Sequence, residues 1–338
     1  MTSDRFVKFK RRTRYAAVVL GGALALAACS GPTADKPAAQ SSAGGNAPAS
    51  SSAGNLHIAV VTHGSSGDAF WNVVKNGAEQ AGKDLGIQVD YKSDGDPGAQ
   101  SKLIDNAIAQ KVDGLVVSMA NPDALKTSIQ NAVKAGIPVV TINSGDSKSA
   151  EFGAIAHVGQ TETIAGQGAG KRLKEAGKTK LLCVIHEAGN IGQNERCDGA
   201  KQAFGNVQTL QVDINNPTDA QSRIKGAVQA DPSIDAVLAL NSQVAAGAVT
   251  AIKGAGSKAQ VATFDLNSDV VAAIKSGDVL FAVDQQQYEQ GYLPIVFLKL
   301  YKENANTVGG GQPVLTGPGF VDKSNVDTVA PYAQRGTR

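Results

Sequence analysis

Short apolar runs alternate with amphipathic segments along most of this chain. In the first half the runs are residues 56–61, 87–91, 114–117 and 137–142, which begin roughly 25 to 30 residues apart, as βα units do. Between the first two runs, apolar and small residues recur at helical spacing, at Phe70, Val73, Val74, Gly77, Ala78, Ala81 and Leu85. Nearly continuous Val, Ile and Leu runs are typical of strands covered on both faces. The pattern therefore predicts a parallel sheet flanked by helices.

The second half repeats this rhythm, with runs at 180–185, 207–213, 236–240, 260–264 and 279–283, each followed by a helical stretch. About 280 residues from Leu56 onward exceed what one small core needs and suit two domains of ordinary size. We therefore expect an α/β fold of two consecutive, doubly wound parallel sheets. In such sheets, ligands bind beyond the carboxyl ends of the strands.

The first 28 residues have a different pattern. Basic residues at Lys8, Lys10, Arg11, Arg12 and Arg14 precede an apolar run over 16–27, which is too short to span a bilayer and predicts an export signal. The run ends in Leu26-Ala27-Ala28-Cys29, which resembles the bacterial lipobox. This resemblance implies that Cys29 carries a lipid, as the first residue of the mature protein. The alternative is an ordinary secretory signal in which the cysteine is incidental.

Residues 29–55 are almost entirely Ser, Ala, Gly and Pro, a composition that predicts a flexible linker rather than a packed core. The predicted signal holds six of the 32 Lys and Arg residues and one of the 30 acidic residues, so the rest of the chain has a net charge of −3. It contains no basic tract, which argues against a nucleic-acid partner. It also contains no second apolar run long enough to cross a bilayer.

Two further cysteines remain, an even number in an oxidising compartment. Cys183 lies in the predicted strand 181–185, and Cys197 lies near the start of the next helical segment. The connection between them is short enough for disulfide geometry, and we expect them to pair. Two buried free thiols are the alternative. A metal site is disfavoured because no other cysteine or paired histidine accompanies them.

Polar residues follow the predicted strands. They include Asp68 with Phe70 and Trp71, Ser118, Asn143 with Ser144, His186 with Glu187, Asn190, Arg196, Asn241, Asp265 and Gln285. Amides, carboxylates and a guanidinium offer paired donors and acceptors to vicinal hydroxyls, and aromatic faces cover the apolar face of a sugar ring. This set of residues predicts a sugar-binding site.

At these positions the chain resembles the ribose-binding-protein-like periplasmic binding proteins, the type I solute receptors of ABC importers. The resemblance spans residues 56 to about 329. Its marks are Asp68-Ala69-Phe70-Trp71, Gly136-Ile137-Pro138-Val139-Val140-Thr141-Ile142-Asn143, His157-Val158-Gly159, Glu195-Arg196-Cys197-Asp198-Gly199, Ala239-Leu240-Asn241, Thr263-Phe264-Asp265 and Val283-Asp284-Gln285-Gln286-Gln287-Tyr288, which leads to Gln290-Gly291-Tyr292.

The resemblance implies two lobes joined by a three-segment hinge, 56–157 with 286–315 and 158–285 with 316–338, that close on a ligand between them. The ligand-binding positions that it implies are Asp68, Phe70, Trp71, Asn143, Arg196, Asn241, Asp265 and Gln285, to which we add Ser144. Structural roles remain open for several of them. Asp68 and Asp265 could be helix caps, one of Phe70 and Trp71 could belong to the core, and Arg196 could pair with Glu187 or Glu195.

The chain also departs from the ribose binders. At the position of Asn143-Ser144 the ribose binders carry an Asp-Arg pair, and near the position of Gln221 they carry an aromatic residue. They also lack the longer loop that this chain has over 62–67. Because a lost charged pair removes a bidentate clamp on hydroxyls, we expect another pentose or hexose, a polyol or a cyclitol instead of ribose. His63, Ser144, His186 and Gln221 are the candidate specificity residues.

An enzyme is the first rival, but none of His57, His63, His157 and His186 lies in a nucleophile or metal-ligand motif. The stretch 166–172 fails the Walker spacing and lies in a helical segment, where small residues indicate close helix packing. A sensory co-receptor remains open as an alternative, whereas a sugar-responsive repressor would need an N-terminal DNA-reading helix pair. We therefore expect a monomeric, lipid-anchored extracytoplasmic receptor without cofactor or metal, which delivers a sugar or polyol to an ABC permease.

Overall fold

The computed structural model describes residues 56–65 and 67–338. The predicted export signal, the linker and Cys29 lie outside these residues. Within the described ranges, every helix is too short or too polar to cross a membrane.

Six strands form a first sheet, in the order β2-β1-β3-β4-β5-β11. The strands are β1 (His57–Thr62), β2 (Gln88–Ser93), β3 (Gly114–Ser118), β4 (Val139–Ile142), β5 (Ala156–Gly159) and β11 (Val314–Leu315). The helices that accompany them are α1 (Ala69–Leu85), α2 (Pro97–Ala109), α3 (Pro122–Lys134), α4 (Asp146–Ser149) and α10 (Gln287–Asn304). All neighbouring strands in this sheet are parallel.

A second six-stranded sheet has the equivalent order, β7-β6-β8-β9-β10-β12. Its strands are β6 (Leu181–Ile185), β7 (Val207–Gln211), β8 (Ala236–Ala239), β9 (Gln260–Phe264), β10 (Val279–Asp284) and β12 (Gly319–Asp322). Its helices are α5 (Glu162–Glu175), α6 (Ile191–Phe204), α7 (Pro217–Ala230), α8 (Ser242–Ala255), α9 (Ser268–Ser276) and α11 (Val326–Arg335). The predicted class, two doubly wound α/β lobes, is confirmed.

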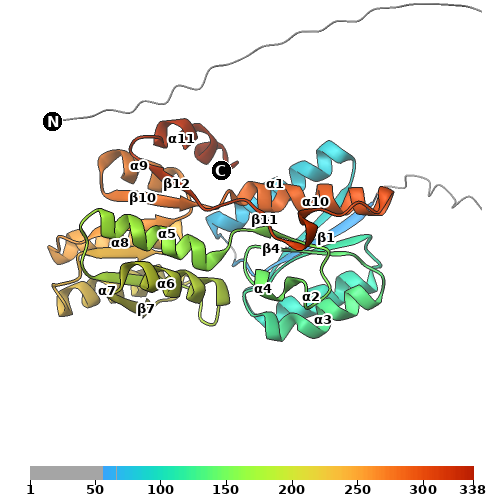
Figure 1. Ribbon diagram of the computed structural model, residues 1–338, viewed down its shortest axis with the longest axis horizontal. Helices are drawn as coiled ribbons and strands as arrows, with labels where there is room; N and C mark the ends of the chain where they lie inside the picture. Colours follow the sequence, from blue (N-terminus) through green and yellow to red (C-terminus); the bar gives the residue numbers. More distant parts are fainter. Residues whose placement is uncertain (1–55, 66) are drawn as a thin grey trace, which may run out of the picture. The chain divides into compact units, whose positions relative to one another are not determined.

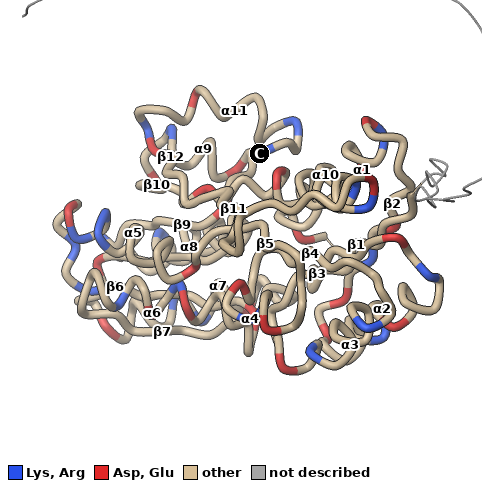
Figure 2. Tube along the Cα trace, turned by 45° about the vertical axis from the view of Figure 1, so that its right-hand side comes forward, with Lys and Arg blue, Asp and Glu red and all other residues tan. Residues whose placement is uncertain are grey.

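Each sheet is covered by helices on both faces (Figure 1). In the first lobe, α1 and α10 pack on one face and α2 and α3 on the other. In the second lobe, α5 and α6 pack on one face, while α7, α8, α9 and α11 pack on the other. This double cover explains why β3, β4, β6 and β8 are buried along their whole length and read as continuous apolar runs. Acidic and basic residues are interspersed over both lobes (Figure 2).

Three chain segments connect the two sheets. They run from β5 to α5, from β10 to α10 and from β11 to β12, and hydrogen bonds join them at Thr316. The Thr316 amide donates to the Gly159 carbonyl over 2.7 Å, and the Gln286 side chain donates to the Thr316 carbonyl over 2.7 Å. Arg338 binds the fully buried Asp284 carboxylate at 2.6 Å and holds the chain end beside the same crossing.

The structure differs from the sequence-based expectation in three respects, which involve the strands β2, β5, β7 and β12. Residues 157–159, expected to lie at and just beyond the first crossing, belong to β5, so the first sheet extends two residues past the boundary set at 157. The edge strands β2 and β7 are partly exposed rather than covered on both faces. The added strand β12 pairs antiparallel with β10, so the second sheet is mixed. An edge position leaves one side of the strand without a neighbour and therefore weakens the apolar signal.

The α5–α6 contact depends on glycine. A Cβ at Gly166 would lie 2.1 Å from the Arg196 carbonyl oxygen, and one at Gly199 would lie 2.1 Å from the Thr163 carbonyl oxygen. The small residues of 166–172 therefore serve close helix packing, as predicted.

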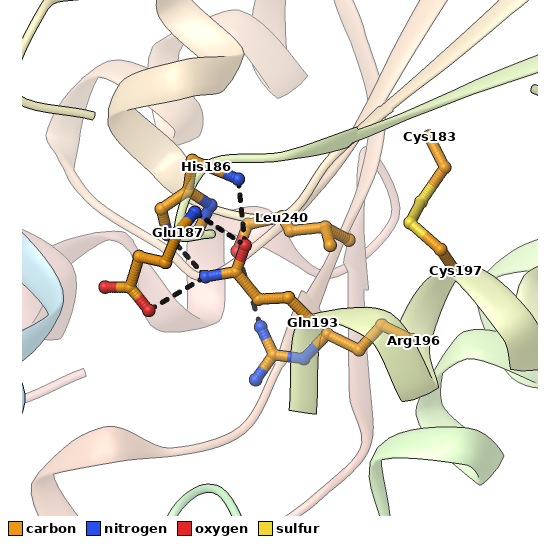
Figure 3. Close-up of a disulfide and its surroundings, with 7 residues drawn as sticks. All are labelled: Cys183, His186, Glu187, Gln193, Arg196, Cys197 and Leu240. Carbon is orange, nitrogen blue, oxygen red and sulfur yellow. Dashed lines mark hydrogen bonds between the residues drawn. A yellow bond between two sulfur atoms is a disulfide. The ribbon is translucent and has the colours of Figure 1, made fainter. Parts of the chain in front are cut away.

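Cys183 on β6 and Cys197 on α6, which were expected to pair, are joined in a disulfide with a Cα–Cα distance of 5.9 Å (Figure 3). The disulfide ties α6 to the centre of the second sheet.

Candidate functional site

A cavity lies at the carboxyl ends of the strands of both sheets, and we call it the inner cavity. Its lining residues are His63, Asp68, Phe70, Trp71, Asn143, Ser144, His186, Glu187, Asn190, Gln193, Arg196, Leu240, Asn241, Asp265 and Gln285. The structure thus brings together the nine predicted ligand-binding residues and two of the candidate specificity residues, His63 and His186. The free volume is about 20 Å³, room for about one water molecule, so the two lobes are closed in this structure.

Gln221, the remaining specificity candidate, lies elsewhere. It stands on α7 and lines a separate cavity together with Ile224, Gln243 and Val244. The sequence signal for Gln221 was the position of an aromatic residue in the ribose binders. In this chain that position lies in the first turns of α7, outside the inner cavity.

Aromatic rings form one wall of the inner cavity. Trp71 makes edge-to-face contacts with Phe70 at a centroid distance of 4.9 Å and with His63 at 4.6 Å. Both Phe70 and Trp71 also pack into the core of the first lobe. Each ring therefore contributes both to the core of the first lobe and to the wall of the inner cavity.

Asp68 caps α1 and lines the cavity at the same time. Its Oδ1 accepts a hydrogen bond from the Phe70 amide over 2.8 Å. Burial and the nearby Glu187 raise the pKa of Asp68 to about 6, against the opposing effect of the backbone amides of Phe70 and Trp71. The helix-cap interpretation is confirmed, and Asp68 also lines the inner cavity, where the Asn241 side chain lowers its pKa through a hydrogen bond.

Arg196 is held by a partner that the sequence analysis missed. Its Nε and one terminal nitrogen donate to the two oxygens of Glu162 over 2.6 and 2.8 Å, and its guanidinium stacks 4.5 Å from the Phe264 ring centroid. Burial and the Glu162 carboxylate act in opposite directions on the pKa of Arg196, which is raised overall. The proposed surface pairs with Glu187 or Glu195 are not formed. Arg196 also donates to the Leu240 carbonyl at 3.4 Å, which orients the guanidinium at the cavity wall (Figure 3).

A chain of amides joins the two lobes at the base of the cavity. Asn143 donates to Gln285 Oε1 over 3.1 Å, and Gln285 donates to Asp265 Oδ1 over 2.7 Å. Gln290 donates to the same Gln285 oxygen and to Thr316 Oγ1, which connects the site to the hinge. Burial raises the pKa of Asp265 to about 7, although Arg196 opposes the shift. Asp265 does not cap α9, because Asn267 does so through its bond to the Val270 amide.

Asn143 and Asp265 both have left-handed backbone conformations, with φ of 61° and 69°. Such conformations cost energy for residues other than glycine and persist where the surrounding structure fixes them. Here each follows the last residue of a buried strand, β4 or β9, at the point where the chain turns away from the sheet. The turn directs both side chains into the cavity.

The loop after β6 forms a compact polar cluster (Figure 3). The Gln193 Oε1 accepts from the amides of His186 and Glu187 over 2.8 and 3.2 Å, and its Nε2 donates to His186 Nε2 over 3.1 Å. Since Nε2 is an acceptor, the His186 proton lies on Nδ1, which is buried and has no hydrogen-bond partner among the described residues. His186 Nδ1 is therefore a buried donor without a partner among the described residues, on a side chain that lines the inner cavity.

Two contacts close the cavity across the lobes. Ser144 Oγ donates to Asn190 Oδ1 over 3.3 Å, and the Asn190 amide approaches His63 Nε2 at 3.4 Å. Burial lowers the pKa of His63 to about 3 and that of His186 to about 4, so both rings are neutral at physiological pH. Neutral imidazoles offer one donor and one acceptor each, which suits hydroxyl recognition.

Glu162 and Gln193 are the lining or supporting residues that sequence reasoning missed. Both lie on helices, away from the strand ends where polar residues were sought. A buried Arg predicts a buried acid, but spacing alone does not identify Glu162. Among residues 56–65 and 67–338, no group of three or more His, Cys, Asp or Glu side chains is arranged to hold a metal ion. The site can form many hydrogen bonds and stack on a ring.

Comparison with known proteins places these features in context. A family profile described as a periplasmic binding protein domain matches residues 58–305. The ribose import binding protein RbsB of Bacillus subtilis (strain 168) is 30% identical over 260 residues, which cover 72% of this chain and 79% of that protein. RbsB of Haemophilus influenzae is 27% identical and covers 67% of this chain and 79% of its own length. The crystal structure of a carbohydrate transporter from Acidothermus cellulolyticus 11B, in complex with myo-inositol, is 42% identical with a TM-score of 0.83, covering 84% of this chain and all of that chain.

Proposed function

The chain belongs to the periplasmic binding proteins, in the branch that serves sugar ABC importers, and from this premise we propose that it is a receptor for a cyclitol or closely related polyol. The observation that carries the proposal is the composition of the inner cavity. Aromatic rings line one side of it, and carboxylate, amide, imidazole and guanidinium groups line the rest. The likeness to a chain bound to myo-inositol supports it.

Each side of a cyclitol ring meets suitable groups in this cavity. The ring C–H face stacks on Trp71, while Asp265 and Asp68 accept from hydroxyls and Arg196 donates to them. His186 Nδ1, a buried donor without a partner among the described residues, gains one when a hydroxyl binds. Such a network discriminates by hydroxyl position, because a missing hydroxyl leaves a buried group unpaired.

The departures from the ribose binders favour a ligand other than ribose. Ser144 stands where the ribose binders have an Arg and is itself bound to Asn143 Oδ1 over 2.9 Å, so no second guanidinium is available for a ribose hydroxyl. His63 on the longer loop instead reaches the cavity wall beside Trp71. We therefore assign specificity to His63, Ser144 and His186 and withdraw Gln221 from this group.

Ligand binding is expected to require lobe opening, because the closed cavity has room for about one water molecule. The closed, ligand-bound form is the one that a permease would recognise. We propose a monomer that binds its ligand with micromolar or tighter affinity, about 8 kcal/mol or more. Lipid attachment at Cys29, with the linker over 29–55, would keep this receptor at the outer face of the membrane.

A ligand screen tests the binding proposal. Thermal-shift measurements across inositols, hexoses, pentoses and linear polyols should show the largest rise in melting temperature with a cyclitol, and calorimetry should return a 1:1 complex. Gln221→Ala, outside the inner cavity, is the matched control and should bind like the wild type. A screen in which no cyclitol, sugar or polyol binds would contradict the proposed function.

The anchoring proposal has its own test. In the native host, Cys29→Ser should shift the protein from the membrane fraction to the soluble extracytoplasmic fraction, and mass spectrometry should find a lipid on the wild-type N-terminal cysteine only. An unmodified Cys29 in a membrane-free wild-type protein would identify an ordinary secretory signal.

A further inference from the structure

The charges around the inner cavity do not balance. Three carboxylates line it, those of Asp68, Glu187 and Asp265. Arg196 is the single Lys or Arg among these lining residues, all of which belong to the part of the chain that the structure describes. Arg196 already binds both oxygens of Glu162, which is 1% exposed, so its charge is offset before any ligand arrives.

The histidines do not restore the balance. His63 and His186 are buried and their pKa values are lowered to about 3 and about 4, so neither ring is cationic near neutral pH. Asn143 and Ser144, which stand where the ribose binders have an Asp-Arg pair, are both neutral, so this position supplies no cation to offset the three carboxylates. The lining residues therefore place three carboxylates against one guanidinium, whose two-oxygen partner is Glu162.

The three carboxylates act on one another. Glu187 raises the pKa of Asp68, and Asp68 raises that of Asp265, with burial the larger cause for both. Burying carboxylates that lack a cationic partner is costly, and the cost falls when they take up protons or when a cation enters. A neutral polyol can satisfy their hydrogen bonds but leaves their charge uncompensated.

We propose that the ligand carries a positively charged amino group, and that the receptor recognises an amino-substituted cyclitol or sugar through Asp68, Glu187 and Asp265. This inference deepens the proposed function and rests on it. A protonated primary amine donates three hydrogen bonds, which fits a wall with several carboxylates. Hydrogen bonds between charged groups are the stronger kind, so the amine adds affinity beyond that of the hydroxyl it replaces.

Glu187 is the residue that distinguishes this class of ligand. Its carboxylate lies at the boundary between the inner cavity and a neighbouring cavity of about 360 Å³, which we call the outer cavity. Glu187 accepts from Gln193 Nε2 over 3.0 Å and also accepts from Asn190 Nδ2, so its position is fixed. A ligand ammonium at this wall lies against a preorganised anion rather than a mobile side chain.

The test compares an inosamine, an inositol with one hydroxyl replaced by an amino group, with myo-inositol by calorimetry at pH 7.5 and low ionic strength. Glucosamine and glucose form a second pair. We expect the amino compound of at least one pair to bind at least tenfold more tightly than its parent. Amino compounds that bind equally or more weakly, while a neutral polyol binds, would overturn the inference and leave the proposed function standing. Failure of all compounds would overturn both.

Charge-removing variants locate the effect. Glu187→Gln keeps the size of the side chain and should bring the affinity ratio of the amino and neutral compounds toward one. Asp68→Asn provides a second variant if the first does not fold. Asp213→Asn, whose carboxylate lines the outer cavity alone, is the matched control and should keep the ratio of the wild type. A preference unchanged in both cavity variants would show that the ammonium is not recognised here.

Discussion

Burial and a neighbouring positive charge act in opposite directions on the pKa of Asp265, the most informative carboxylate of the site. Asp265 is 2% exposed, accepts from Gln285 and lies within the field of Arg196. Its left-handed backbone fixes the side chain toward the cavity instead of solvent. A residue held in this way contributes to binding through its position and through its protonation state, and the two effects can be separated.

Replacing Asp265 with alanine removes an acceptor from a desolvated network. We expect Asp265→Ala to weaken ligand binding by tenfold or more, because the hydroxyl and the Gln285 amide both lose a partner. Calorimetry gives the affinity, and circular dichroism verifies that the variant is folded. Unchanged affinity in a folded Asp265→Ala protein would remove this residue from the binding site.

The pH dependence of stability isolates the charge. Since the folded-state pKa of Asp265 is raised to about 7, the folded protein binds more protons than the unfolded chain between about pH 4 and pH 7. Stability from this group is present below pH 4 and is lost as the pH rises through 7. Asp265→Asn removes the titration, so its melting temperature relative to wild type should rise between pH 4 and pH 8, by roughly 2–4 °C per kcal/mol.

Other groups titrate in the same range and are common to both proteins. They include Asp68 and Glu195, whose pKa values are raised, and His63 and His186, whose pKa values are lowered. Asp68 acts on the pKa of Asp265, so its contribution cancels in the difference only when both proteins also carry Asp68→Asn. Differential scanning calorimetry of both proteins in matched buffers gives the comparison. A difference in melting temperature that is flat with pH would show that Asp265 does not titrate in the folded state.

At the scale of elements, helix contact in the second lobe depends on missing side chains. Gly199→Ala places a Cβ 2.1 Å from the Thr163 carbonyl and should destabilise the fold by about 1–3 kcal/mol or more, as overpacking does. Gly226→Ala on α7 meets no atom within 4 Å and should stabilise by about 0.5–1 kcal/mol through helix propensity. Urea unfolding measures both, and equal effects of the two substitutions would contradict the packing argument.

The disulfide is the second constraint on α6. It closes a loop between residues 14 apart in sequence, and this loop size corresponds to about 3 kcal/mol in the chain-entropy model. The double variant Cys183→Ala, Cys197→Ala should lose stability of that order. It should bind ligand more weakly as well, because α6 carries Gln193 and Arg196. If the double variant and the wild type had the same unfolding midpoint, both with and without reductant, the disulfide would contribute nothing to stability.

The strands and site residues that could be predicted from the sequence are those whose residue pattern lies within one element or directly after it. The covered strands β1, β3, β4, β6, β8, β9 and β10 were predictable because they give continuous apolar runs, and residues such as Asn143 and Asp265 were located by the strand ends before them. The Arg196–Glu162 pair was not predictable, because its members lie on two helices brought together by glycine contacts. The strands β5, β11 and β12 were missed. His157 and Gly159 interrupt the apolar pattern of β5, β11 has only two residues, and β12 contains Gly319 and Asp322.

For the whole molecule, the closed form is held by bonds across the two lobes. On the exposed side of the inner cavity, Gln243 of α8 accepts from the Ala69 amide over 3.2 Å and donates to the Gly67 carbonyl at 3.5 Å. The Ile191 amide donates to the Ala120 carbonyl over 3.0 Å at another point of the closure. These bonds form between the lobes and therefore exist only when the lobes are together.

Removing the Gln243 side chain should bias the protein toward open forms without altering the binding groups. Because apparent affinity scales with the fraction of the competent form, Gln243→Ala should raise the apparent Kd about two- to tenfold, as expected for the loss of an exposed hydrogen bond. The dissociation rate should rise, since opening becomes easier. Gln229→Ala, exposed on α7 away from the closure, is the matched control. Unchanged affinity, dissociation rate and small-angle scattering in Gln243→Ala would show that closure does not depend on this contact.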